Sequence, residues 1–194
     1  MSRLNIRVGA AALDLADSLG AVPDQVEVAK KRALTLVASA IRRKLVAEIV
    51  SATQLPEAAV KARVAVYNMN SRYQSTRVVP SSAAIPASDY AFAVQRTRSS
   101  WTRARYSVPW VGGRKIGAGF VNPLGQKGAP LSTRSARGKY TYKYGKPKHA
   151  MGPSAAAAAK QIITEQFVSD AQQRLMNTFE DQLIKRILKD DESL

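Results

Sequence analysis

The stretch AKKRALTLVASAIRRKLVAEIV, residues 29–50, decides the fold class of this chain. Its apolar side chains recur every three or four residues, which is the spacing of one face of an α-helix. This face consists of Leu34, Val37, Ala38, Ile41, Leu45 and Ile49. Pro23 and Asp24 precede the run, and Asp24 with Glu27 three residues later matches a capping box. The pattern predicts a helix over about 24–51, longer than the average of about 11–12 residues.

A second long helix is predicted at the other end of the chain. Gly152-Pro153-Ser154 interrupts regular structure, and the alanines of 155–159 are strong helix formers. Beyond them an apolar residue recurs at every fourth position: Ile163, Phe167, Ala171, Leu175, Phe179, Leu183 and Ile187. We expect one C-terminal helix within 150–194. The residues predicted to pack from the two long helices are Leu34, Ile41, Leu45, Phe167, Leu175, Phe179 and Leu183.

Between these helices the spacing changes to the two-residue alternation of β-strands. Strands are predicted at 62–68, 77–79, 103–108, 115–121 and 139–144, with Gly112-Gly113 as the turn before 115–121. Shorter helices are predicted at 8–19, ended by Gly20, and at 53–59. Segments rich in Pro, Ser, Gly and charge predict loops at 80–88 and 122–138.

These elements predict an α+β fold, in which long N- and C-terminal helices pack on a small, mostly antiparallel sheet with long basic loops. At 194 residues the chain fits one domain. Within it we expect an arm or short helix at 1–21 and a helical part at 22–60. A basic β-rich region at 61–149 with a long loop at 122–138, and the C-terminal helix at 150–194, complete it.

The positive charge of the chain is concentrated in its middle. The chain has 30 Lys and Arg against 14 Asp and Glu, a formal net charge of +16. The segment 90–149 holds 13 of the basic residues and no acidic residue. Such a field calls for an anionic partner, which is nucleic acid, an acidic protein face or a membrane surface. The candidate contact residues are Arg103, Arg105, Arg114, Lys115, Lys127, Arg134, Arg137, Lys139, Lys143, Lys146 and Lys148.

Aromatic residues alternate with these basic residues. The aromatic residues are Trp101, Tyr106, Trp110, Tyr140, Tyr142 and Tyr144. Aromatic side chains between cations suit stacking on nucleic-acid bases with phosphate contacts alongside. Aromatic residues on one face of a strand are, however, more often part of a core or an interface. Of the two interpretations we favour the second, a core or an interface.

The reactive side chains that most enzymes use are sparse. There is no cysteine, so disulfides and cysteine metal sites are excluded, and the single histidine, His149, lies in a turn-like Lys-Pro-Lys-His context. No acid, base and nucleophile set and no phosphate-binding glycine motif is recognisable. We therefore expect a protein that is not an enzyme and has no cofactor or metal. The sequence also predicts no signal peptide, membrane span or membrane partner.

In the order of its elements the chain resembles the minor tail protein Z family, the tail-completion proteins of lambda-like siphophages. Four features carry this resemblance over roughly 22–189. They are the basic, Ala-rich helix with Ala33–Arg43; Leu55-Pro56 leading to Lys61, Arg63 and Val64; Gly119-Phe120 and then Gly138 before Tyr140-Thr141-Tyr142-Lys143; and Gly152-Pro153-Ser154 opening a helix that ends near Arg186-Ile187-Leu188. The chain departs from the family pattern in its large 122–136 loop and its 155–159 alanine run.

The resemblance implies a structural role late in the assembly of a phage tail. Such a protein completes the head-proximal end of the tail, so that the tail joins a DNA-filled head. The implied partners are tail-terminator, tail-tube and neck or head-completion proteins, together with further copies of the chain in a ring, expected to be a hexamer. The implied location is the tail or neck of the virion, after assembly in the host cytoplasm, with non-specific contact to packaged DNA as a further expectation.

Two alternatives stay open. The chain could be another neck component, such as a tail terminator or head-completion protein. It could also be a cellular nucleic-acid-binding protein of the ribosomal or nucleoid type, a class that the basic segment 90–149 equally suits.

Overall fold

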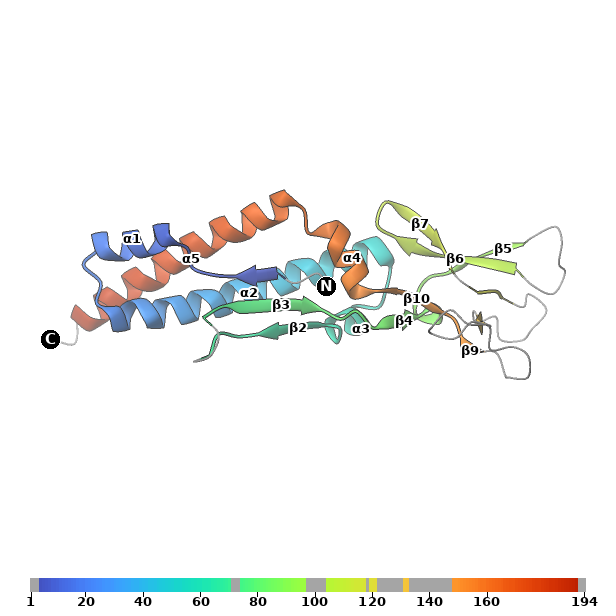
Figure 1. Cartoon of the computed structure of the whole chain (residues 1–194), viewed down its shortest axis with the longest axis horizontal. Coiled ribbons are helices and arrows are strands. Elements are labelled where there is room, and N and C mark those ends of the chain that lie inside the picture. Colours follow the sequence, from blue (N-terminus) through green and yellow to red (C-terminus); the bar gives the residue numbers. More distant parts are fainter. Residues whose placement is uncertain are drawn as a thin grey trace. The chain divides into compact units, whose positions relative to one another are not determined.

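A computed structural model gives the fold of the chain and describes residues 4–70, 74–96, 104–117, 119–121, 131–132 and 148–191. Within these residues the fold is α+β, as predicted, with long helices near both ends and small antiparallel sheets (Figure 1). The chain divides into two compact units. Unit 1 consists of 1–45, 64–80 and 163–194, and unit 2 consists of 46–63 and 81–162. The prediction of a single domain over 1–194 stays a prediction.

The longest helix is α2, Pro23–Thr53, which confirms the helix predicted over 24–51. Its start differs from the predicted capping box. The backbone N–H of Val22 donates to Oε1 of Gln25 at 3.1 Å, and Pro23 takes the first helical position, where its missing N–H costs nothing. Glu27 instead pairs with Lys30 at 3.0 Å. The predicted Asp24–Glu27 cap is therefore wrong, because Pro23 shifts the helix start by one residue.

The predicted C-terminal helix is interrupted. Its two parts are α4, Ala155–Ile162 in unit 2, and α5, Glu165–Asp191, within the residues of unit 1. At the interruption, Oγ1 of Thr164 accepts a hydrogen bond from the N–H of Phe167 at 3.3 Å, so Thr164 caps α5. Ile163 consequently lies outside both helices. The prediction of one C-terminal helix was wrong because the apolar spacing continues across a residue whose side chain can start a new helix.

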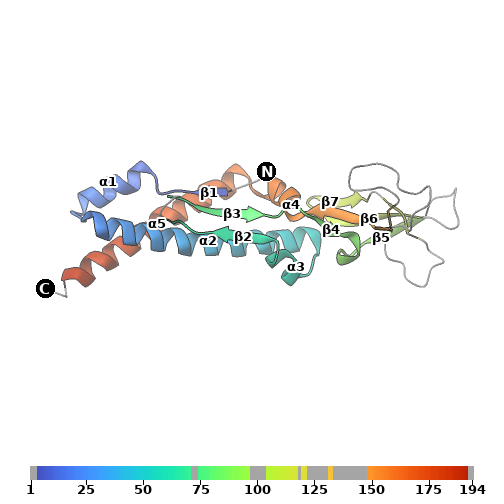
Figure 2. The ribbon, with the colours of Figure 1, turned by 60° about the horizontal axis from the view of Figure 1, so that its bottom comes forward.

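In unit 1, α2 and α5 pack side by side and run antiparallel (Figures 1 and 2). The buried face of α5 is Phe167, Ala171, Leu175, Phe179 and Leu183, and that of α2 within this unit includes Leu34, Val37, Ala38, Ile41 and Leu45. Polar contacts join the helices at two levels. Lys44 pairs with Asp170 at 3.1 Å, and Nε2 of Gln25 donates to Asp190 at 3.0 Å.

The rest of unit 1 is a short helix and a three-stranded sheet. The helix α1, Ala10–Ser18, was predicted over 8–19, and Gly20 follows it with φ +66°. The sheet order is β1-β3-β2, with β1 Leu4–Ile6, β2 Val64–Tyr67 and β3 Thr76–Pro80, all antiparallel. The strands predicted at 62–68 and 77–79 thus correspond to β2 and β3, which pair with each other. The strand β1 was not predicted, because three residues are too few to show a period.

Unit 2 begins with the end of α2 and a short helix. Gln54 has φ +53°, a left-handed conformation that ends α2, and its N–H still donates to the carbonyl of Val50 at 2.8 Å. The next helix, α3, spans Glu57–Lys61 and is preceded by Pro56. The helix predicted over 53–59 therefore starts later than expected, because 53 still belongs to α2.

Three small antiparallel sheets make up the β structure described in unit 2. They are β4 Ala84–Pro86 with β10 Met151–Ser154; β5 Ala93–Arg96, β6 Ala104–Trp110 and β7 Gly113–Ile116; and β8 Leu131–Ser132 with β9 Lys148–His149. A single turn of 3-10 helix, η1 Ala87–Asp89, follows β4.

These sheets correct several predictions. The loop predicted at 80–88 contains β4 and the first two residues of η1, the loop at 122–138 contains β8, and His149 lies in a strand. The reason is the same in each case: these short strands pair with segments remote in sequence, which no local pattern reveals. Of the strand predicted over 115–121, only residues 115 and 116 lie in β7, and Val121 forms a bridge to Ala104. The strand predicted over 139–144 lies outside the described residues.

A buried tyrosine fastens the β4–β10 sheet. Tyr90 is 3% exposed, and its Oη donates to the carbonyl of Pro153 at 2.6 Å. Its ring lies against Gly152, where a Cβ would come within 2.6 Å of the ring carbon Cε2, so only glycine fits there. Burial raises the pKa of Tyr90 to about 12; nearby Arg63 lowers it and Asp89 raises it.

Candidate interaction surface

The sheet β5-β6-β7 of unit 2 carries the largest described part of the basic segment. Its central strand β6 pairs antiparallel with both neighbours, and the turn between β6 and β7 uses Gly112 with φ +78° and Gly113 with φ +147°. Both conformations favour glycine, so the predicted Gly112-Gly113 turn is confirmed. This tight turn fixes the β6–β7 register, which places Arg114 opposite Pro109 and Lys115 opposite Val108.

The register places two arginines on one face of this sheet. Residues directly opposite each other in an antiparallel pair share a face, and so do alternate residues of one strand. Arg105 lies opposite Gln95 of β5. Arg114 lies opposite Pro109, which is four residues beyond Arg105 on β6 and is therefore on the same face of the sheet. Both arginines are exposed, and Ile116 beside them is 56% exposed.

The guanidinium of Arg114 is held by three hydrogen bonds. Its Nε donates to Oγ of Ser107 at 3.0 Å, and its Nη2 donates to the carbonyls of Ser107 at 2.9 Å and Ala91 at 3.1 Å. The side chain thus lies over Ser107, which is 2% exposed. A guanidinium has five N–H donors, so those of Nη1 keep no partner among the described residues. The group is therefore both fixed in place and able to donate to an anion.

The opposite face carries a lysine over a buried aromatic core. Nζ of Lys115 lies 5.5 Å from the centre of the Trp110 ring, within the range of a cation–π contact. Lys115 itself is exposed, whereas Trp110 is 9% and Tyr106 is 0% exposed. The core interpretation therefore holds for Tyr106 and Trp110, because neither ring offers a free face for stacking on a base. Trp101, Tyr140, Tyr142 and Tyr144 lie outside the described residues.

The Tyr106 ring packs against the backbone beside β7. A Cβ at Gly117 would overlap the end of this ring, so the close approach requires glycine at that position. The Tyr106 hydroxyl is buried and has no hydrogen-bond partner among the described residues. Burial raises the pKa of this phenol above its ordinary value of 10.0.

The predicted contact residues divide into three groups. Arg105, Arg114 and Lys115 are exposed on the sheet β5-β6-β7, two on one face and one on the other. Lys148 lies in β9, and nothing is described of its side chain. The remaining candidates lie outside the described residues: Arg103, Lys127, Arg134, Arg137, Lys139, Lys143 and Lys146. The sequence did not point to Ser107 and the Ala91 carbonyl, because their role depends on strand register alone.

The predicted helix-packing residues all belong to unit 1 and are all buried: Leu34, Ile41, Leu45, Phe167, Leu175, Phe179 and Leu183. Within the described part of the chain, no group of three or more His, Cys, Asp or Glu side chains could hold a metal ion. No helix among the described residues is long and apolar enough to cross a membrane.

The arrangement on this sheet suits the binding of anionic groups without selection of their sequence or shape. Arg105, Arg114 and Lys115 are exposed on the β6–β7 hairpin, and the segment 90–149 contains no carboxylate that could neutralise them. Comparison of the chain with protein-family models, with curated proteins and with solved structures found no match.

Proposed function

We propose that this chain is a structural protein of a tailed-phage virion, which completes the head-proximal end of the tail and joins it to the head or neck as a subunit of a ring around the DNA channel. Its role is to bind other molecules rather than to catalyse a reaction. The proposed partners are tail-terminator, tail-tube and neck or head-completion proteins and further copies of the chain, with non-specific contact to packaged DNA.

The resemblance of the sequence to tail-completion proteins supports this proposal. The features behind that resemblance include a long N-terminal helix, a strand after Pro56 and a C-terminal helix after Gly152-Pro153-Ser154. The corresponding elements are α2, β2 and the α4–α5 pair. Long helices give a ring subunit the surface that contacts with two neighbours require.

The observation on which the proposal mainly depends is the exposed, uncompensated charge of the sheet β5-β6-β7. Arg114 is held in place by backbone carbonyls and by Ser107. The N–H groups of its Nη1 donate to no carboxylate among the described residues. Arg105 and Lys115 are exposed beside it. Phosphate groups of a DNA backbone, or the acidic face of a neck protein, would supply the missing negative charge.

A complementation experiment tests the proposal. A phage that lacks this gene would be supplied with the variant Arg105→Gln/Lys115→Gln. This variant removes two positive charges from the sheet but keeps the three hydrogen bonds of Arg114, which we call the Arg114 clamp. The matched control is Arg43→Gln/Lys160→Gln, which removes the same charge from exposed positions on α2 and α4. We expect the sheet variant to lower the yield of infectious particles at least tenfold and to leave separate heads and tails, while the control behaves as wild type.

Absence of the protein from purified virions, or full infectivity of particles made without it, would contradict the proposal. Equal losses with the sheet variant and the control would show that only net charge matters, and would remove the sheet from the argument.

The same exposed cations favour the second candidate, a cellular nucleic-acid-binding protein. The two functions differ in what the isolated protein does. A free nucleic-acid binder shows tight binding whose logarithm falls with the logarithm of salt concentration by about 0.9 for each phosphate contact. A neck protein assembles on its protein partners and binds duplex DNA only weakly when alone. A salt titration with random-sequence DNA therefore separates them.

A further inference from the structure

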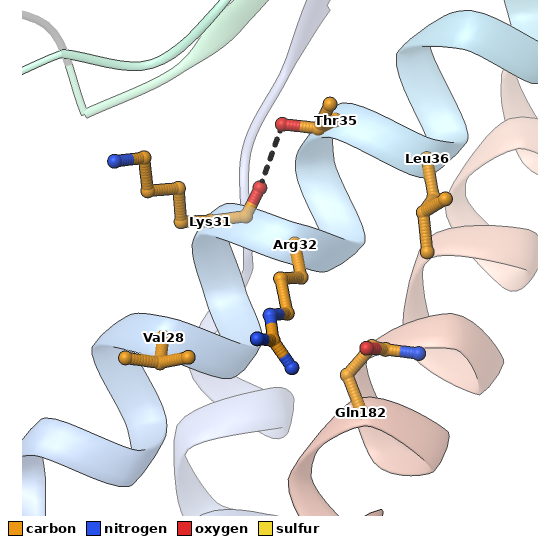
Figure 3. A pocket seen from close by; sticks show the side chains of 6 residues that line it. All are labelled: Val28, Lys31, Arg32, Thr35, Leu36 and Gln182. Atoms are coloured by element: carbon orange, nitrogen blue, oxygen red, sulfur yellow. Dashed lines mark hydrogen bonds between the residues drawn. The ribbon is translucent and has the colours of Figure 1, made fainter. Parts of the chain in front are cut away.

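A groove lies between α2 and α5 in unit 1, with a volume of about 670 Å³. It is lined by Val28, Lys31, Arg32, Thr35, Leu36 and Gln182 (Figure 3). The side chains of Arg32 and Gln182 point from the two helices into the space between them, and Leu36 points toward α5. Leu36 is 52% exposed, so this groove presents an apolar side chain to the solvent.

The rim of this groove is positively charged. Lys31 and Arg32 are both exposed, and neither forms an ion pair with a described carboxylate. An apolar floor with a basic rim is complementary to a helix that has exposed apolar residues and acidic neighbours.

The chain itself presents such a helix. On α5, Ile184 is 39% and Leu188 is 57% exposed, and a spacing of four residues puts them on one face. Glu180 and Asp181 lie one turn before Ile184, are exposed, and have no described cationic partner. We call Asp181, Ile184 and Leu188, with Glu180, the outer stripe of α5. At about 100° per residue, Lys185 and Lys189 border the stripe on the side of Asp181, and Glu180 borders it on the opposite side.

The outer stripe cannot occupy the groove of its own chain. At about 100° per residue, Ile184 and Leu188 lie on the side of α5 away from Gln182, which lines the groove. Only another molecule can bring a stripe of this kind to the groove, and a second copy of the chain carries one.

We propose that the outer stripe of α5 in one copy docks into the α2–α5 groove of a second copy, with Leu188 and Ile184 against Leu36 and Val28 and with Asp181 beside Arg32. Because groove and stripe are different surfaces, the contact is heterologous, and repetition of it produces a ring or an open chain of copies. This inference rests on the ring assembly of the proposed function and names the surfaces through which copies meet. The contact itself requires neither DNA nor tail proteins.

Sedimentation velocity on the purified full chain tests the contact. We expect oligomers in the wild type, and for Leu36→Glu and Leu188→Glu at least a tenfold rise in the concentration at which they form. Leu13→Glu is the control, since Leu13 is 46% exposed on α1 in the same unit but lies outside both surfaces. Circular dichroism would verify that each variant is folded. A wild type that stays monomeric at 100 μM, or a control that disrupts assembly equally, would overturn the proposal.

Charge reversal tests the pairing directly. Arg32→Glu and Asp181→Arg should each weaken self-association at least tenfold, and the double variant should regain most of the loss. Weakening that adds up in the double variant would overturn the Arg32–Asp181 pairing.

Cysteine cross-linking distinguishes the arrangement, because the natural chain has no cysteine. With Leu36→Cys and Leu188→Cys, oxidation should give covalent dimers in a mixture of the two variants but not with either alone. Dimers of either variant alone would show a symmetric contact instead and would refute the docking proposed here.

Failure of this inference differs from failure of the proposed function. If the chain joins heads to tails in complementation but Leu36→Glu neither alters assembly nor lowers infectivity, only the contact is wrong. If groove and stripe variants alter self-association but virions do not contain the protein, the phage function is wrong and the contact stands.

Discussion

Two buried tyrosines of unit 2 differ in one hydrogen bond. The hydroxyl of Tyr90 donates to the carbonyl of Pro153, whereas that of Tyr106 has no partner among the described residues. A buried hydrogen bond contributes about 1 kcal/mol, while a buried polar group without a partner costs free energy. The same substitution should therefore have opposite effects at the two positions.

We expect Tyr90→Phe to lower the free energy of unfolding by about 1 kcal/mol, because it leaves the Pro153 carbonyl without its donor. Tyr106→Phe should leave the free energy unchanged or raise it, because it removes an unsatisfied hydroxyl. Urea denaturation of the two variants and the wild type measures both. A larger loss for Tyr106→Phe than for Tyr90→Phe would contradict the hydrogen-bond assignment.

The same residues predict a loss of stability at alkaline pH. The folded pKa of Tyr90 is about 12 against an ordinary 10.0, and that of Tyr106 is also raised. Because folding holds these protons more tightly, the stabilisation is complete below pH 10 and is lost as the pH rises toward about 12. Between pH 9.5 and pH 11.5 the free energy of unfolding should fall less steeply in the Tyr90→Phe/Tyr106→Phe variant. Identical slopes would exclude these two phenols as the cause.

At the scale of the elements, the interruption between α4 and α5 depends on a capping residue. Thr164 accepts a hydrogen bond from the N–H of Phe167, and this bond satisfies one of the free donors at the start of α5. Ser39, in the middle of α2, bonds instead to the carbonyl of Thr35 at 2.9 Å. The two hydroxyls are exposed, but only the first contributes to starting a helix.

We expect Thr164→Ala to lower the free energy of unfolding by about 1 kcal/mol and Thr164→Ser to keep most of it. Ser39→Ala should be neutral or stabilising by a few tenths of a kcal/mol, since alanine is the better helix former. Thermal unfolding followed by circular dichroism compares them. If both alanine variants lose the same stability, Thr164 does not act as a cap.

At the scale of the whole molecule, the segments of the two units alternate along the sequence. Unit 1 is assembled from three segments and unit 2 from two, and α2 supplies 23–45 to the first and 46–53 to the second. A break in α2 would therefore remove residues from both cores. This shared helix is the physical reason to expect that the units unfold together, as one domain.

Two optical probes can test this prediction. Both tryptophans, Trp101 and Trp110, belong to the segments of unit 2, whereas α5 and most of α2 belong to unit 1. Denaturation followed by tryptophan fluorescence and by far-UV circular dichroism should therefore give coincident transitions. Leu34→Ala in unit 1 and Ile85→Ala in unit 2 are both at fully buried positions. Each should lower the free energy of unfolding that both probes report by about 2–5 kcal/mol. Separate transitions, each sensitive to one substitution, would show two domains.

The positions of the helices follow from local patterns in the chain. The three-and-four spacing around Leu34 and Ile41 is repeated often enough to predict α2 and its buried face, and the same holds for Phe167 to Leu183 in α5. The glycine turn before β7 and the pairing of β2 with β3 are also local, because their partners are near in sequence. Local patterns in the sequence were also sufficient to predict the α+β class and to show that the positive charge is concentrated in 90–149.

Other features arise only when remote segments meet. No local period indicates that Ile85 lies opposite Gly152 or that Leu131 lies opposite His149, because strands of two or three residues obtain their stability from partners rather than from propensity. The Arg114 clamp requires the β6–β7 register and a carbonyl contributed from outside both strands, and the groove beside Leu36 requires two helices brought together. Local spacing determines which face a residue occupies, but only tertiary packing determines what that face meets.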